Sequence, residues 1–138
     1  MSTKFGGLSF CVLFLAFCFS VHGQQPTKIL RIGYISGTGN ETNQGPYVEA
    51  LRDGLRNLGY IEGKNFVIEY RGAEGKADRV PALVSELIDR QVNVLIAPIL
   101  PAILAAKQAT KTIPIVMVAG VDPVASKLVD SLARAGGN

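Results

Sequence analysis

Cysteine, histidine and tryptophan are scarce in this 138-residue sequence, which has two cysteines, one histidine and no tryptophan. Cys11, Cys18 and His22 all precede Gln24, so the chain from Gln24 onward has neither a thiol nor an imidazole. That part therefore excludes disulfides, metal sites built from Cys or His, a Ser-His-Asp triad and a Cys-His pair. Carboxylates, Lys and Tyr remain for catalysis, but the usual acid–base residue for neutral pH is missing. The sequence favours a binding protein over an enzyme and indicates no cofactor.

An excess of charge of one sign is also absent. The formal net charge is +3, and the Lys and Arg residues are scattered among Asp and Glu. No basic block and no alternation of basic and aromatic residues is present. A nucleic acid is therefore not expected as a partner.

The first 23 residues have the pattern of a secretory signal peptide. Lys4 supplies the positive start, an apolar run of about 14 residues follows from Leu8 to Val21, and Val21-His22-Gly23 suits a signal peptidase. We expect cleavage near Gly23, which divides the chain into a leader (1–23) and a mature α/β lobe (24–138). The protein is then expected to be secreted.

Two alternatives to a cleaved leader stay open. A permanent transmembrane anchor is the weaker one, because the apolar run is shorter than the roughly 20 residues that span a bilayer. A lipid anchor on Cys18 is the other, although bulky Phe17 occupies a position where lipoprotein signals have a small residue.

Short β-branched runs alternate with amphipathic helical stretches in the rest of the chain. In the first predicted helix, Val48, Leu51, Leu55 and Leu58 share one face, and Gly59 suits its end. This alternation predicts an α/β fold, a parallel βαβ sheet sandwiched by helices. The expected strands are 29–35, 66–70, 92–97 and 113–118, and later helices are expected at 78–90, 101–109 and 124–133.

Ligands of parallel sheets bind beyond the carboxyl ends of the strands. The candidate site is therefore formed by four loops, which are Ser36–Glu41, Tyr70–Glu74, Pro98–Pro101 and Ala119–Pro123. A dinucleotide loop is not favoured, because Thr42 stands where G-x-G-x-x-G needs its last glycine.

Several of these loop residues have an alternative role. Ser36, Thr38 and Asn40 offer hydroxyl and amide groups to a ligand, but such residues are also ordinary turn formers. Asp122 accepts hydrogen bonds from a ligand or caps a helix that follows it. Tyr70 stacks on or borders the ligand, whereas its neighbours Glu69 and Arg71 are interpreted as a solvated strand end.

An ordered set of segments carries a family resemblance that extends from about Arg31 to the last residue. The segments resemble the N-terminal lobe of bacterial ABC-transporter substrate-binding proteins, and they are 50–65, 68–71, 105–110, 113–116, 122–124, 131–134 and 136–138. The resemblance implies a type I periplasmic-binding fold, in which two hinged α/β lobes enclose a small solute and deliver it to a membrane permease. It also implies a small polar ligand, with an amino acid as the leading candidate.

The sequence departs from this family at the third loop. Relatives commonly have a Gly-Thr pair where Ile99 and Leu100 stand, before the Pro-Ala that opens the helix. The backbone N–H groups of Ala102 and Ile103 still suit a carboxylate at the helix end, but the hydroxyl is lost. A less polar ligand, or none, is expected at Leu100.

The second lobe of the family is absent from this sequence. We therefore expect weak or undetectable ligand binding by the chain alone. Two other functions stay open: a non-transport, stand-alone or remnant lobe, and an enzyme on a doubly wound fold, for which no nucleophile, base or phosphate loop is found.

Overall fold

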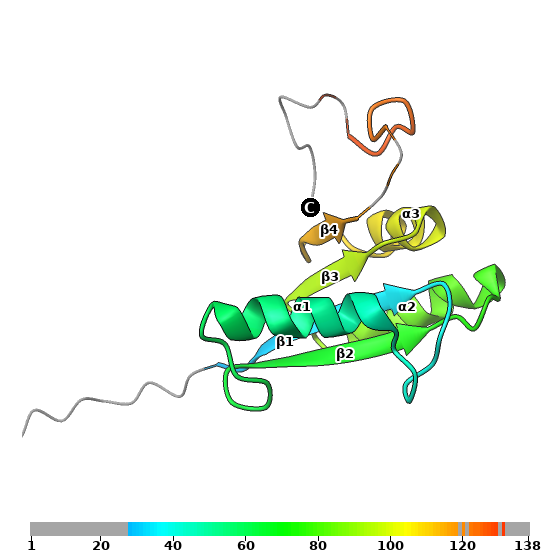
Figure 1. The fold of residues 1–138 in the computed structure, drawn as a ribbon. Helices are drawn as coiled ribbons and strands as arrows, with labels where there is room; N and C mark the ends of the chain where they lie inside the picture. The colour runs from blue at the N-terminus through cyan, green and yellow to red at the C-terminus, as the bar shows by residue number, and fades with distance from the viewer. Residues whose placement is uncertain (1–27, 119, 121, 130, 132–138) are drawn as a thin grey trace, which may run out of the picture.

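The computed structural model describes residues 28–118, 120, 122–129 and 131, and in this part four strands form one parallel sheet (Figure 1). The sheet order is β2-β1-β3-β4. Leu30 pairs with Phe66 and Ser36 with Gly72, so the carboxyl ends of β1 and β2 are level. The strands are β1 (Leu30–Ser36), β2 (Phe66–Gly72), β3 (Val94–Ala97) and β4 (Ile115–Met117).

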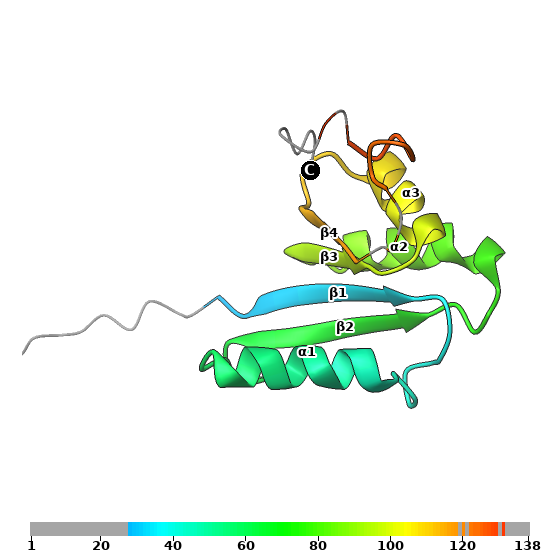
Figure 2. The same cartoon turned by 45° about the horizontal axis from the view of Figure 1, so that its top comes forward.

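Helices cover both faces of this sheet, as Figure 2 shows. Helix α1 (Pro46–Asn57) lies on one face, and α2 (Val80–Asp89) and α3 (Leu100–Ala109) lie on the other. A short 3₁₀ turn, η1 (Ala77–Arg79), leads into α2. The predicted parallel α/β sandwich is confirmed.

Strand residues alternate between two apolar layers, because successive side chains of a strand point to opposite faces. Buried residues between the sheet and α1 include Ile32, Val48 and Phe66. On the other face, Ile35 packs with the residues of α2 and α3. The side chains of this second layer that are largest and almost fully buried include Leu87, Leu95 and Ile103.

Several element boundaries differ from the prediction. Leu58 was expected on the buried face of the first helix, but α1 ends at Asn57 and Leu58 is 76% exposed. Helix α3 begins at Leu100, so Pro101 is its second residue rather than its first. Strands β3 and β4 are both shorter than expected, at Val94–Ala97 and Ile115–Met117.

The helix predicted over 124–133 is wrong in the part that the structure describes. Residues 123–127 form turns, and 128 and 129 form a bend. Lys127 has a φ of 55°, a left-handed backbone conformation that a right-handed helix does not contain. Residues 130, 132 and 133 of that predicted helix lie outside the described residues.

The predicted leader, residues 1–23, also lies outside the described residues. In the part of the chain that is described, none of the helices combines the length and apolar character that crossing a membrane requires.

Candidate ligand-binding site

Two of the four predicted loops meet at the carboxyl end of β2. The close approach is between backbones: a Cβ added at Gly72 would lie 2.2 Å from the carbonyl oxygen of Gly39. Gly39 itself has a φ of 78°, and a Cβ there would lie 2.7 Å from the Tyr70 hydroxyl. Glycine at both positions therefore lets the loop after β1 rest on the end of β2.

Side-chain oxygen atoms organise the loop between β1 and α1. Ser36 Oγ donates a hydrogen bond to the carbonyl oxygen of Thr38 and accepts one from the Thr38 N–H at 3.3 Å. Asn40 Oδ1 accepts from the backbone N–H groups of Thr42 (3.0 Å) and Asn43 (2.8 Å) and from Thr42 Oγ1 (2.8 Å). Ser36 and Asn40 thus form turns, the alternative role considered for them. Thr38 and Asn40 are also exposed, so ligand contact by them stays a prediction.

Tyr70 contacts the loop between β1 and α1 through its hydroxyl group. Only 3% of Tyr70 is exposed, and its ring stacks on Tyr34 with a centroid separation of 5.8 Å and an interplanar angle of 14°. Its hydroxyl donates to the carbonyl oxygen of Thr38 at 2.9 Å. Burial, followed by the neighbouring Tyr70 and Tyr47 hydroxyls, raises the pKa of Tyr34. Contact between Tyr70 and a ligand stays a prediction.

The start of α3 adjoins the loop after β1. The nearest atom to a Cβ added at Gly37 would be Ile99 Cδ1, at 3.1 Å. Leu100, the first residue of α3, is 37% exposed, and Ala102 is buried. The N–H groups of Ala102 and Ile103 both donate to the Ile99 carbonyl oxygen, at 3.0 and 3.1 Å. A ligand carboxylate at this helix end would have to compete with the Ile99 carbonyl oxygen for these two N–H groups.

Asp122 caps a turn after β4. Its Oδ1 accepts hydrogen bonds from the N–H groups of Val124 (2.8 Å) and Ala125 (3.1 Å). Asp122 was expected to cap a helix, but among the described residues the segment that it caps is a turn. Within the described residues, no hydrogen bond or ion pair joins Asp122 to the loops around Tyr70.

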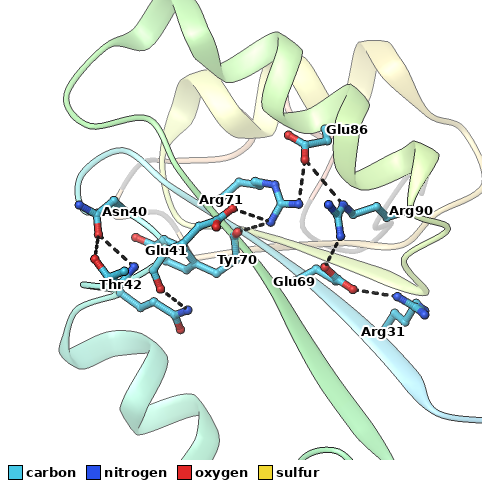
Figure 3. Close-up of polar contacts among 10 residues, drawn as sticks. Arg31, Asn40, Glu41, Thr42, Glu69, Tyr70, Arg71, Glu86 and Arg90 are labelled. Carbon is cyan, nitrogen blue, oxygen red and sulfur yellow. Dashed lines mark hydrogen bonds and ion pairs between the residues drawn. The ribbon is translucent and has the colours of Figure 1, made fainter.

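Arg71 was interpreted as part of a solvated strand end, and that interpretation is wrong. Only 7% of Arg71 is exposed, and its Nη2 donates to Glu86 Oε1 at 2.8 Å. Its Nη1 donates to the Tyr70 carbonyl oxygen at 2.6 Å and lies 3.4 Å from Glu41 Oε1 (Figure 3). The hydrogen bond from Arg71 lowers the pKa of Glu86 and also raises that of Arg71. In the sequence, the one indication of this buried ion pair was an arginine between Tyr70 and Gly72, near the end of a predicted strand.

Further ion pairs extend from Glu86 across β2 to Arg31 on β1. Arg90 approaches Glu86 at 3.6 Å and Glu69 at 3.3 Å, and Arg31 pairs with Glu69 at 2.8 Å (Figure 3). Positive and negative groups therefore alternate from Arg31 to Glu41. Charged side chains at an edge strand discourage pairing with another chain.

Of the hollows among the described residues, one lies at the loops around Arg71 and one lies beside α1. The polar one has a volume of about 440 Å³, within the usual range for small-molecule sites. The second, of about 650 Å³, is mostly apolar and lies between α1 and the strands β3 and β4. In the described residues, no group of three or more Asp, Glu, His or Cys residues is placed to hold a metal ion. The polar hollow is lined by Asn40, Glu41, Thr42, Arg71, Gly72, Glu74, Arg79, Leu83 and Glu86.

Comparison with known proteins decides the family. The family of ABC transporter substrate binding proteins matches residues 42–138, from the loop before α1 to the last residue. The chain belongs to this family.

Relatives of this substrate-binding protein chain share its fold. It is 35% identical over 92 residues to a tyrosine-binding protein of Clostridioides difficile. The aligned region covers 67% of this chain and 26% of the relative. An ABC domain from Streptococcus pneumoniae, solved in complex with L-Trp, has a TM-score of 0.69 at 25% identity, covering 80% of this chain and 37% of that one.

Two more solved structures have similar scores. A conserved domain protein from Vibrio cholerae has a TM-score of 0.67 at 32% identity and covers 80% of this chain and 37% of that one. A ligand-free, open substrate-binding protein with adhesive properties from Clostridium difficile has a TM-score of 0.66 at 27% identity. The match covers 79% of this chain and 37% of that one. The chain thus spans about a quarter of the curated relative's length and 37% of each solved chain.

Proposed function

We propose that this chain is the N-terminal lobe of the solute-binding component of an ABC importer. The observation that carries the proposal is the family match over residues 42–138, which includes three of the four strands and all three helices in the described part. In this proposal the chain supplies one wall of a cleft between two hinged lobes. Closure around a solute then couples ligand binding to a shape that a membrane permease distinguishes.

The proposed ligand is a small polar solute, with an aromatic amino acid as the first choice. The tyrosine-binding relative and the solved complex with L-Trp support this class. The proposed contacts are Ser36, Thr38, Asn40, Tyr70, Leu100, Ala102 and Asp122. Among them, exposed Leu100 is suited to the apolar part of the ligand, because it carries no hydrogen-bonding group.

Titration calorimetry of the intact protein tests this ligand class. Saturable heat is expected with L-tyrosine or L-tryptophan, and a weaker signal is expected with L-alanine, which lacks the ring. Equal responses to all three, or no response to any, would contradict the aromatic amino-acid proposal. Uptake of the labelled ligand into membrane vesicles, with and without the purified protein, tests the importer role and the permease partner separately.

Secretion belongs to the same proposal. Cleavage near Gly23 predicts a mature protein that begins at Gln24, which N-terminal sequencing of the exported protein checks. Lipid attachment at Cys18 instead predicts a membrane-bound protein that Cys18→Ser releases. A precursor that keeps its first 23 residues in the exported fraction would contradict both routes.

A further inference from the structure

Arg71 is a buried cation whose hydrogen-bonding capacity is not filled. Its side chain is 9% exposed, and its Nε has no hydrogen-bond partner among the described residues. Burial of a guanidinium is costly unless each donor finds an acceptor. An arginine in a hollow with one unpaired donor is therefore a candidate for binding an anionic group, which would have to approach an Nη atom because Nε itself is buried.

The two carboxylates near Arg71 are held differently. Glu86, on α2, accepts from Nη2 at 2.8 Å, whereas Glu41 Oε1 lies 3.4 Å from Nη1. Glu41 belongs to the loop after β1, and its side chain is 72% exposed. Figure 3 shows the two carboxylates on either side of the guanidinium. Glu86 is thus the fixed partner and Glu41 the replaceable one.

The hollow around Arg71 has charges of both signs. Three carboxylates (Glu41, Glu74 and Glu86) and two guanidinium groups (Arg71 and Arg79) line it, and Arg79 pairs with Glu74 at 2.9 Å. A ligand with one carboxylate and one ammonium group would add no net charge to this set. Its carboxylate suits Arg71, and its ammonium group suits the carboxylate of Glu74.

We propose that Arg71 anchors a carboxylate-binding subsite, in which the carboxylate of a small amino acid replaces that of Glu41 at Nη1. The nearby carboxylate of Glu74 then faces the ammonium group of the ligand. The N–H groups of Ala102 and Ile103 at the start of α3 already donate to the Ile99 carbonyl oxygen, which leaves Arg71 as the better anion site. This inference rests on the proposed amino-acid function and assigns it a recognition residue.

The test compares three ligands with the same ring by titration calorimetry of the intact protein. The ligands are L-tyrosine, tyramine, which lacks the carboxylate, and 3-(4-hydroxyphenyl)propionate, which lacks the amine. Tyramine should bind at least tenfold more weakly than L-tyrosine, because a charge-assisted hydrogen bond is lost. The propionate should bind more weakly than L-tyrosine but more tightly than tyramine.

Two variants test the residues. Glu41→Gln removes the competing charge from an exposed loop and should raise the affinity for L-tyrosine several-fold. Glu62→Gln is the matched control, because it removes the same charge near the opposite end of β2, where Glu62 pairs with Arg52. It should leave the affinity unchanged. The double variant Arg71→Met/Glu86→Leu replaces the buried pair with apolar groups and should lower L-tyrosine affinity at least tenfold.

The outcomes separate this inference from the proposed function. If the wild-type protein binds L-tyrosine but neither Glu41→Gln nor the double variant changes its affinity, the subsite is refuted and the proposed function stands. Equal effects of Glu41→Gln and Glu62→Gln would show a general charge effect and would also refute the subsite. A wild-type protein that binds no amino acid refutes both proposals. If the double variant fails to fold, Glu41→Gln and its control still decide the question.

Discussion

Alanine at Gly72 should displace the loop that forms the candidate site. A Cβ at this position would lie 2.2 Å from the carbonyl oxygen of Gly39, 2.7 Å from its carbonyl carbon and 3.1 Å from Asn40 Cα. All three atoms belong to the backbone, so no side-chain rotation relieves the clash. The φ of Gly72 is not in the left-handed region, so its strand conformation is one that alanine also adopts. The predicted effect is therefore steric.

The expected cost is about 2 kcal/mol, within the usual range for added volume at a packed position. Gly54→Ala is the matched control. Gly54 lies inside α1, and apart from the neighbouring backbone of that helix no atom lies within 4 Å of its added Cβ. Alanine there should stabilise the protein by about 0.5–1 kcal/mol, because glycine is a poor helix former. The same substitution, glycine to alanine, is thus expected to lower the free energy of unfolding at position 72 and to raise it at position 54.

Urea denaturation of the intact protein measures the free energy of unfolding of each variant, and hydrogen exchange measures protection of residues 36–45. Gly72→Ala should lower both quantities, whereas Gly54→Ala should raise the stability and leave the loop unchanged. If Gly72→Ala unfolds at the same urea concentration as the wild type, with unchanged exchange in the loop, the close approach of Gly39 to β2 is incorrect.

Three further changes test the surroundings of this loop. Arg71 holds the pKa of Glu86 below its ordinary value. The ion pair therefore stabilises the folded protein at pH values above the ordinary pKa of Glu, and this stabilisation is lost as the pH falls through the lowered pKa of Glu86. Glu86→Gln should therefore reduce the acid dependence of unfolding, and an unchanged pH profile would contradict the pair. Tyr70→Phe removes the hydrogen bond to Thr38 and should cost about 1 kcal/mol, measured by the urea midpoint. Leu87→Ala in the fully buried core should cost about 2–5 kcal/mol, and a smaller change would show that the core closes around the missing atoms.

Local pattern was sufficient to predict the layers of the fold. Each strand ends in turn-forming residues, and the helical stripes determine which faces are buried, so the parallel sandwich follows from periodicity. The prediction of a helix after Asp122 is wrong because a capping residue indicates a first turn but does not show that the turn continues into a helix. Asp122 does accept two backbone N–H groups, whereas Lys127 takes a left-handed conformation that stops a helix.

The role of Arg71 could not be predicted from the sequence. In a strand near its end, an arginine beside a glutamate is usually solvated, and alternation does not show which neighbour covers it. Its partner Glu86 follows 15 residues later on α2, and Glu41 comes from the loop after β1. Only the packing of α2 and this loop against the end of β2 brings the two carboxylates to one guanidinium.

Three consecutive residues at the end of β2 determine where the loop after β1 lies. Tyr70 holds Thr38 from the α1 face of the sheet, and Arg71 approaches Glu41 from its outer edge. Gly72 allows the Gly39 backbone to rest against the strand between them. Because these contacts share one loop, a change at Gly72 that moves Gly39 also weakens the other two. The free-energy changes at these positions should therefore not add, as expected for residues coupled through a shared backbone segment.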